Sequence, residues 1–154
     1  MLKKSLLFFV AFLVALQFIP LEKTNPKSDA TLALHADAKV MQVLKKSCYD
    51  CHSNATEWSI YSDIAPLSFV VHSHVDDARK ALNFSEWQKI SKDIKIARLK
   101  RAITTLKLDT MPLSSYLMFH QEKSLSSEDK KVLTQWCKSE LKSLGVDTIS
   151  RTVR

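Results

Sequence analysis

The chain has 154 residues, a formal net charge of +7, and a single glycine beside four prolines. This length suggests one domain with a modest hydrophobic core. Helix-forming residues dominate, while strand alternation and the turn residues typical of hairpins are absent, which excludes an all-β fold. The composition therefore predicts an almost entirely helical domain.

Residues 1–20 have the pattern of a leader. Lys3 and Lys4 form a positive start, and residues 6–19 are apolar except for Gln17. This pattern is typical of a secretory signal peptide, or of a short signal anchor formed by residues 5–21. The run is short for a membrane-spanning helix, which needs about 20 residues, and a helix of a cytosolic core is the alternative. We expect residues 21–36, which lack periodicity, to form a tether.

The first helix of the domain is predicted to begin near Asp37 and to run into the sequence CYDCH, residues 48–52. This is a CxxCH motif, the attachment signature of c-type haem. The offset of three residues places Cys48 and Cys51 on one side of a helical turn, where both thiols can add to the two haem vinyl groups. His52 then supplies the proximal iron ligand. The motif predicts one covalent haem c and its iron.

Two other interpretations of the motif are open. A thioredoxin-type redox pair normally sits between a strand and a helix, and no strand pattern precedes Cys48. A zinc site would need a second pair of ligands, and Cys137 with the scattered histidines offers none at zinc-finger spacing. Covalent haem is attached outside the cytoplasmic membrane in bacteria, so the motif and the leader together predict a periplasmic protein. An exported protein of this kind is not expected to bind nucleic acid.

Three further helices are predicted between the motif and residue 108. Asp63 is expected to cap the first of them after an aromatic loop. Ser85 and Gln88 have the spacing of a capping box for a short second helix. The apolar pattern then slips near Lys95, which indicates a bend or break before a longer helix that ends near Leu108.

The segment around this longer helix is strongly basic. Its cations are either an ordinary solvated face or a docking surface for an acidic redox partner or an anionic membrane. The residues are Lys89, Lys92, Lys95, Arg98, Lys100, Arg101 and Lys107.

Several side chains could bind the iron opposite His52. Met111 lies in a break before Pro112, where its thioether is free of helix geometry, and it is the predicted distal ligand. His120 and His74 are the less favoured candidates, and an open sixth position is the remaining possibility. A methionine or histidine in such places can equally be an ordinary core residue.

The last helix is predicted to begin after Ser126, its cap, and to end at Gly145. Cys137 lies on the apolar side of this helix. We expect a buried free thiol there, with a disulfide to a partner or an iron ligand as alternatives. Residues 146–154 have the composition of a basic tail.

Residues 37–144 resemble the haem-binding domain family of small bacterial proteins, which is related to cytochrome c. The resemblance implies a small helical domain wrapped round one covalent haem c, with attachment at Cys48 and Cys51 and an axial ligand in His52. The family usually has Trp-Pro-Trp-Tyr-Ser where this chain has WSIYS (58–62), and a second proline where it has Leu113. The matching residues are CYDCHSN (48–54), Thr56, Trp58, Tyr61-Ser62, IAPLSFVV (64–71), His74-Val75, ALNFSEW (81–87), Met111-Pro112, Tyr116 and His120.

These observations predict a haem-binding domain over residues 37–145 that carries single electrons, rather than an enzyme. The rival is a peroxidase, or a sensor of gas or redox state, with an open sixth iron position. His72, His74 and Arg79 could supply its distal groups. A haem carrier is a third and weaker possibility, because covalent attachment opposes transfer.

Overall fold

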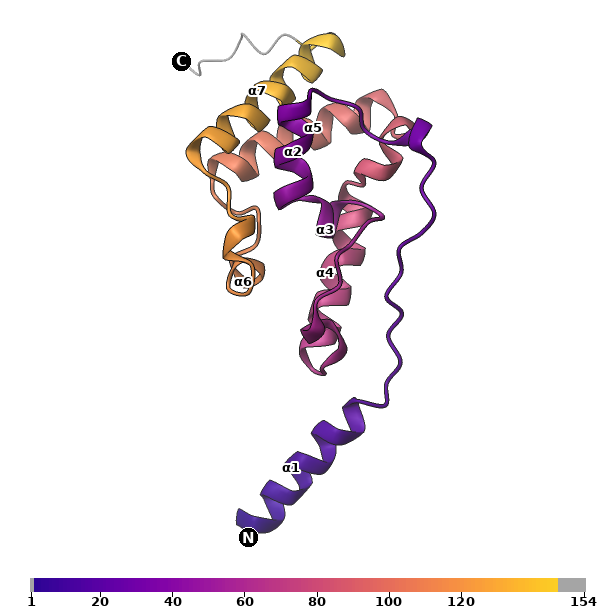
Figure 1. The fold of residues 1–154 in the computed structure, drawn as a ribbon, viewed down its shortest axis with the longest axis vertical. Helices are drawn as coiled ribbons and strands as arrows, with labels where there is room; N and C mark the ends of the chain where they lie inside the picture. The colour runs from indigo at the N-terminus through magenta and orange to yellow at the C-terminus, as the bar shows by residue number, and fades with distance from the viewer. Residues whose placement is uncertain (1, 147–154) are drawn as a thin grey trace.

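The computed structural model describes residues 2–146. All regular elements within this range are helical, as predicted, and Figure 1 shows their arrangement. The predicted basic tail lies outside the described residues except for Val146. The α-helices are α1 (Leu2–Leu16), α2 (Ala38–Ser47), α3 (Tyr49–His52), α4 (Leu67–Ala81), α5 (Lys92–Lys107), α6 (Ser114–Leu117) and α7 (Ser127–Ser143). The 3-10 helices are η1 (Ala30–Leu32), η2 (Ile60–Asp63), η3 (Phe84–Lys89) and η4 (Gln121–Lys123).

Helices α2, α5 and α7 form the body of the domain. α5 and α7 pack against each other, and α2 packs on α7. Each contributes one apolar face, and burial of these faces is the main favourable term in the stability of the domain. The core consists of Leu34, Val40, Val43, Leu44, Phe84, Trp87, Leu99, Leu106, Leu133, Cys137 and Leu141.

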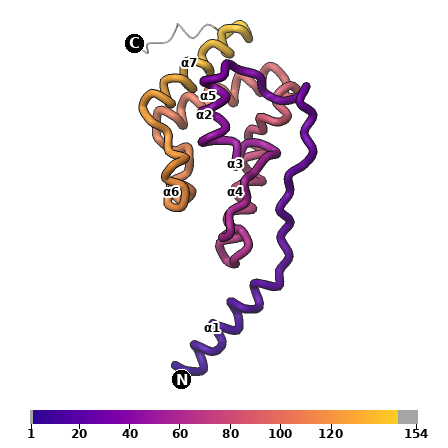
Figure 2. The backbone as a smooth tube through the Cα atoms, in the orientation of Figure 1, coloured from indigo at the N-terminus to yellow at the C-terminus, as the bar shows by residue number. Residues whose placement is uncertain are grey.

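Two arms extend from the same side of this body. One arm is α4 with α3 and η2 packed on it, and the other is α6 with η4. Helix α1 lies beyond the tip of the α4 arm. The chain that follows α1 runs beside α4 on its way back to the body, as Figure 2 shows.

The predicted ends of α7 are confirmed. Ser126 accepts a hydrogen bond from the backbone N–H of Asp129, whose carboxylate accepts one from the N–H of Ser126, so that a complete capping box starts the helix. Gly145 has a φ of 79° and donates its N–H to the carbonyl of Lys142. A side chain is strained in this left-handed conformation, which explains the chain's one glycine.

Two predicted caps are wrong. α4 begins at Leu67 after Pro66, while Asp63 ends η2 and pairs with Lys23 instead of capping the helix. Ser85 does not open a capping box. Asn83 caps η3 by accepting from the N–H of Ser85, and the Ser85 hydroxyl accepts from the N–H of Asn54. Asp63 and Ser85 do not cap these helices because each bonds to a residue from a distant part of the chain.

The predicted tether is in fact bonded to the domain over much of its length. We call residues 17–29 the strap. The side-chain amide of Asn25 donates to the carbonyl of Thr56 and accepts from its N–H, at 3.0 and 3.1 Å. Arg79 on α4 donates to the carbonyl and hydroxyl of Thr24 and to the Asn25 side chain. Single-sequence periodicity could not reveal contacts of this kind.

The start of the strap is fastened in the same reciprocal way. Gln17 donates its side-chain amide to the carbonyl of Ala65 at 3.1 Å and accepts from the Ala65 N–H at 3.0 Å.

The described helices include none with both the length and the apolar character needed to cross a membrane.

The ion pair between Asp129 and Lys46 ties α7 to α2, with 2.8 Å between Lys46 Nζ and Asp129 Oδ2. The Lys46 bond and the Ser126 N–H lower the pKa of Asp129 below its ordinary value of 3.8. We expect Asp129→Asn, which keeps the size of the side chain, to reduce the free energy of unfolding at pH 7 by about 1 kcal/mol. Denaturant unfolding measures this difference.

The difference should depend on pH in one direction. Because the folded-state pKa is lowered, the stabilisation is present above pH 3.8 and is lost as the pH falls through the folded-state value. Glu128→Gln is the matched control, since Glu128 and its partner Lys39 are both largely exposed. An equal loss in both variants, or a loss that persists at pH 2, would contradict the role of Asp129.

Candidate functional site

An apolar cavity of about 440 Å³ lies between the two arms and reaches the body of the domain. The volume falls in the range of sites for small molecules and cofactors, about 300–1,000 Å³. The CxxCH side chains Cys48, Cys51 and His52 all line it, and so do the three predicted distal candidates, Met111, His120 and His74. The structure thus brings all six predicted site residues to one cavity.

The imidazole of His52 is held by the C-terminal end of α4. Its Nδ1 lies 3.1 Å from the carbonyl oxygen of Ala78 and 3.0 Å from that of Leu82. Carbonyls only accept, so Nδ1 carries the proton and Nε2 keeps its lone pair. Burial lowers the pKa of His52, which also favours the neutral ring. A neutral histidine whose Nδ1 is bonded to a backbone carbonyl is the usual form of a metal-binding histidine.

Cys48 and Cys51 are free thiols in this structure. α3 begins directly after Cys48, and the Cys48 carbonyl accepts from the N–H of Cys51 and from that of His52. The turn therefore sets the offset of the two sulfurs. Burial raises the pKa of Cys48 to about 12 and that of Cys51 to about 11, so both are protonated at neutral pH.

A network of polar bonds fixes the turn of chain that follows His52. Arg79 donates from Nε to the carbonyl of Ser53 at 2.8 Å and from a terminal nitrogen to the Thr56 hydroxyl. Asn54 accepts from the side-chain amide of Asn83 at 2.7 Å. These bonds connect the end of α3 to α4 and η3, and they satisfy polar groups that are buried here.

Asp50, a variable position of the CxxCH motif, joins the two arms. Its carboxylate is 12% exposed and accepts a bond from the phenol of Tyr116 on α6 at 2.5 Å. Lys123 on η4 pairs with the same carboxylate at 3.3 Å. Burial and the bond to Asp50 raise the pKa of Tyr116, so the phenol keeps its proton and donates. No local sequence pattern marks Asp50 or Lys123, so neither was predicted as a site residue.

A second bridge between the arms involves His120 itself. Its Nε2 lies 2.6 Å from the phenol oxygen of Tyr61 on η2, and its Nδ1 lies 3.3 Å from a carboxylate oxygen of Glu122. Its ring stacks on Tyr116, with 4.6 Å between the ring centroids. Both ring nitrogens therefore have partners, and His120 could bind iron only after giving up its bond to Tyr61 or to Glu122.

Met111 and His74 line the same cavity as His120 from other parts of the chain. Met111 lines the cavity from the segment between α5 and α6, is 37% exposed, and has a thioether sulfur that is a weak hydrogen-bond acceptor. His74 lines the cavity from α4, the helix that also holds His52 through Ala78. Met111 therefore stays the predicted distal ligand, and it lines the cavity from the segment that leads into the α6 arm.

His72 and Arg79, the other groups of the rival reading, are not among the lining residues. His72 is 8% exposed and stacks on Trp58, with 4.6 Å between the ring centroids. Arg79 is committed to the strap and to the turn after α3. Of His72, His74 and Arg79, the three groups suggested for a peroxidase, only His74 therefore lines the cavity.

Cys137 on α7 is a free thiol and is 1% exposed, as predicted. Burial raises its pKa to about 12.

Within residues 2–146, no three His, Cys, Asp or Glu side chains are grouped as ligands of a metal ion, and no strand precedes Cys48 there. The described chain thus lacks the context that the zinc and thioredoxin interpretations require.

The comparison with protein families matches residues 11–139 to the haem-binding domain family. The match covers most of the chain, which therefore belongs to this family of haem-binding proteins. It begins inside α1, so it includes the strap as well as the helices that surround the cavity. No curated protein and no solved structure matches the chain.

The bridge through Asp50 generates a prediction about stability. Tyr116→Phe removes only the phenol oxygen, and it leaves a buried carboxylate with one hydrogen bond fewer. We expect the free energy of unfolding to fall by about 1–2 kcal/mol, because bonds to charged groups are the stronger ones. Tyr61→Phe is the matched control, since the phenol of Tyr61 bonds to a ring nitrogen of His120 rather than to a carboxylate, at a site that is only partly buried. A larger loss in Tyr61→Phe than in Tyr116→Phe would contradict the importance of Asp50. Thermal unfolding of both variants measures the effect.

Proposed function

We propose that this haem-binding protein is a periplasmic monohaem c-type cytochrome that carries single electrons. The observation that carries the proposal is His52, a neutral imidazole fixed through Nδ1 in the wall of an apolar cavity, beside the two thiols of the CxxCH motif. Cys48 and Cys51 would attach the cofactor, and His52 Nε2 would bind its iron. A haem c bound in this way supplies a one-electron couple between ferric and ferrous iron.

Met111 is the proposed distal ligand. His52 of the α4 arm and Met111 of the segment that leads into the α6 arm would both hold the iron, which suits an electron carrier and leaves no place for a substrate. The partners of His120 support this choice, because its nitrogens already bond to Tyr61 and Glu122. The rival peroxidase or sensor would need the sixth position of the iron to be open, and His74 in the cavity wall could then supply a distal group.

The basic segment is the proposed docking surface for an acidic redox partner. Lys92, Lys100 and Lys107 on α5 are exposed, and Arg98 and Arg101 of the same helix line the cavity. Positive charge placed this close to the cofactor cavity would steer an acidic partner towards it, and salt would weaken the effect. The export of the chain and its anchoring through α1 are likewise parts of this proposal.

Covalent attachment is the first test. The chain is co-expressed with a cytochrome c maturation system and the purified protein is denatured fully. We expect haem to stay with the polypeptide, and we expect Cys48→Ala and Cys51→Ala each to reduce the bound yield sharply. Cys137→Ala is the matched control and should leave the yield unchanged. Haem that separates from the parent chain in denaturant would overturn the covalent assignment.

The distal ligand is the second test. Met111→Ala should convert six-coordinate low-spin iron to five-coordinate or water-bound iron, abolish the near-infrared band of thioether ligation, and lower the reduction potential. The parent ferrous protein should resist carbon monoxide, whereas Met111→Ala should bind it. His120→Ala and His74→Ala serve as controls that keep the low-spin spectrum. Rapid binding of carbon monoxide by the parent protein would favour the peroxidase or sensor instead.

A further inference from the structure

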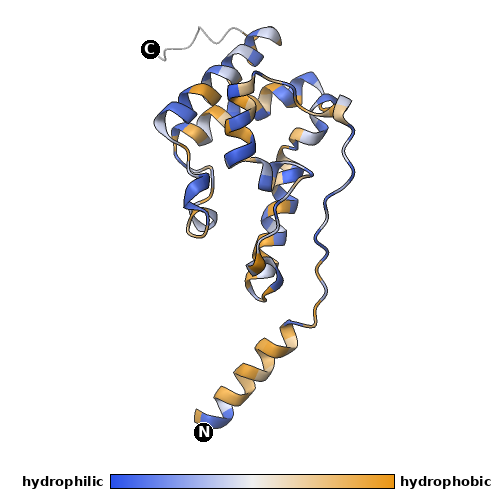
Figure 3. Cartoon of the chain, viewed as in Figure 1, coloured by the Kyte–Doolittle hydropathy of each residue, from blue (hydrophilic) through white to orange (hydrophobic). Residues whose placement is uncertain are grey.

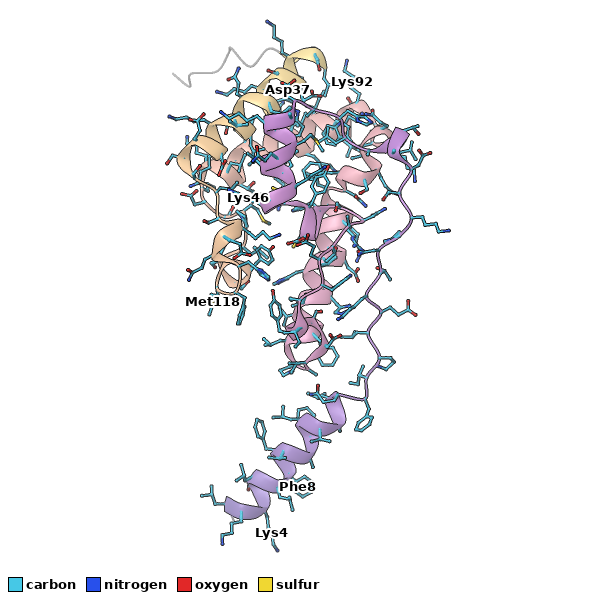
Figure 4. All side chains as sticks on the ribbon, viewed as in Figure 1. Lys4, Phe8, Asp37, Lys46, Lys92 and Met118 are labelled. Atoms are coloured by element: carbon cyan, nitrogen blue, oxygen red, sulfur yellow. The ribbon has the colours of Figure 1, made fainter. Side chains whose placement is uncertain are left out.

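Exposed apolar side chains gather at the tips of the two arms, and three of them, Leu67, Val70 and Phe119, also line the cavity. On the α4 arm they come from η2 and the start of α4, and on the other arm from the end of α6. We call this set the apolar rim. It consists of Ile60, Ile64, Leu67, Val70, Met118 and Phe119, which are between 44% and 80% exposed. Met118 marks the tip of the α6 arm in Figure 4. Exposed apolar groups scattered singly need no explanation, but a contiguous set indicates an interaction surface.

The rim is continuous with the apolar N-terminal helix. Beyond Lys3, Lys4 and Ser5 every residue of α1 is apolar, in keeping with the orange that covers most of the helix in Figure 3, and none of its residues is buried. Phe18 and Ile19, which follow it, are 81% and 49% exposed. The reciprocal bonds between Gln17 and Ala65 fix the end of α1 beside the rim, since Ala65 lies between Ile64 and Leu67 in the chain.

The charges near this junction compensate each other. Lys23 of the strap forms a salt bridge with Asp63 of η2, the residue directly before Ile64 in the chain. The exposed cations of α5 instead belong to the body, from which both arms extend; Lys92, labelled in Figure 4, lies at the end of the molecule opposite α1. The six side chains of the rim carry no charge, unlike those of the proposed docking surface for an acidic protein.

The length of α1 adds a geometric argument. Its 15 residues span about 22 Å at about 1.5 Å per residue, whereas the hydrocarbon core of a bilayer is about 30 Å thick. An apolar helix shorter than this core is accommodated by thinning of the bilayer or by drawing its flanking residues towards the membrane. The group that flanks α1 here is the rim.

We propose that the apolar rim rests in the surface of the lipid bilayer that holds α1, so that the mouth of the cavity faces the membrane. This inference rests on the proposed anchoring through α1. A lipid surface fits better than a second protein, because the bonds of Gln17 hold the rim beside the helix that lipid would surround. The arrangement places the open edge of the cofactor cavity towards redox partners within the membrane, and the cations of α5 towards soluble ones.

Fluorescent labelling of single cysteines tests the proposal on the full-length, haem-loaded protein in phosphatidylcholine vesicles. Cys48 and Cys51 would be consumed by the cofactor and Cys137 is buried, so Ile64→Cys, Ile94→Cys and Phe8→Cys each add one reactive thiol. The parent chain, which should take up no label, is the blank. Ile94 is the matched control because it is 47% exposed against 51% for Ile64, but lies on α5. Labels are quenched with iodide from the water and with nitroxide-bearing lipid from the bilayer.

We expect the label at residue 64 to be quenched more by nitroxide lipid than by iodide, and the label at residue 94 to show the reverse order. If residue 64 behaves like residue 94 while residue 8 lies in lipid, the anchoring stands and the rim proposal is overturned. If residue 8 also lies in water, or if mass spectrometry shows that the mature protein has lost its leader, both the anchoring and the rim proposal are overturned. The haem absorption of each labelled protein shows independently whether the cofactor assignment holds.

Discussion

The bond from His52 to the end of α4 is the constraint on which the candidate site depends. It fixes the tautomer of the imidazole, and it also places the short helix α3 against a second, longer helix. The Ala78 carbonyl already accepts the backbone N–H of Leu82, and a carbonyl oxygen has a second lone pair that can accept from His52 as well. Leu82 is the C-cap of α4, where carbonyls lack the helical partners of the interior. His52, one residue beyond the second cysteine, donates to both of these carbonyls. The same contact therefore serves the local structure of α4 and prepares the ring for a metal.

The remaining geometry follows from fastening the second arm to this unit. Asp50 lies one residue before Cys51, and its carboxylate holds Tyr116 and Lys123 of the other arm. Met111 belongs to the segment that leads into that arm. The position of the proposed distal ligand thus depends on a residue within the motif of the proximal side. Substitution at Asp50 is expected to affect both sides of the cavity, although Asp50 itself need not bind the cofactor.

The sequence predicted the parts of the structure that local patterns specify. The CxxCH turn, the apolar faces of α2, α5 and α7, the Ser126 cap and the glycine at 145 depend on spacing over a few residues, and all are found. The errors arose where distant partners compete for a side chain. Asp63 pairs with Lys23 rather than capping α4, and Ser85 bonds to Asn54 rather than opening a capping box.

The candidate site shows the same division. Cys48, Cys51 and His52 were predicted because they form one motif, and Met111 because a proline follows it. Asp50, Tyr61 and Lys123 could not be assigned roles, because their partners are 59 or more residues away in the chain. A carboxylate at a variable position of the motif, together with tyrosines that recur on both sides of the cavity, was the only available signal.

The strap changes what a tethered domain can do. A flexible linker of 16 residues, the length first expected for residues 21–36, would let a domain wander about 20 Å from its attachment point. Paired amides at Asn25 and Gln17, and the guanidinium of Arg79, remove most of that freedom. If α1 anchors the chain as proposed, the domain would not be free to swing between an electron donor and an electron acceptor. Under the proposed anchoring and electron transfer, both partners would have to come to a cofactor of fixed height and orientation, and lateral diffusion in the membrane would set how often they meet.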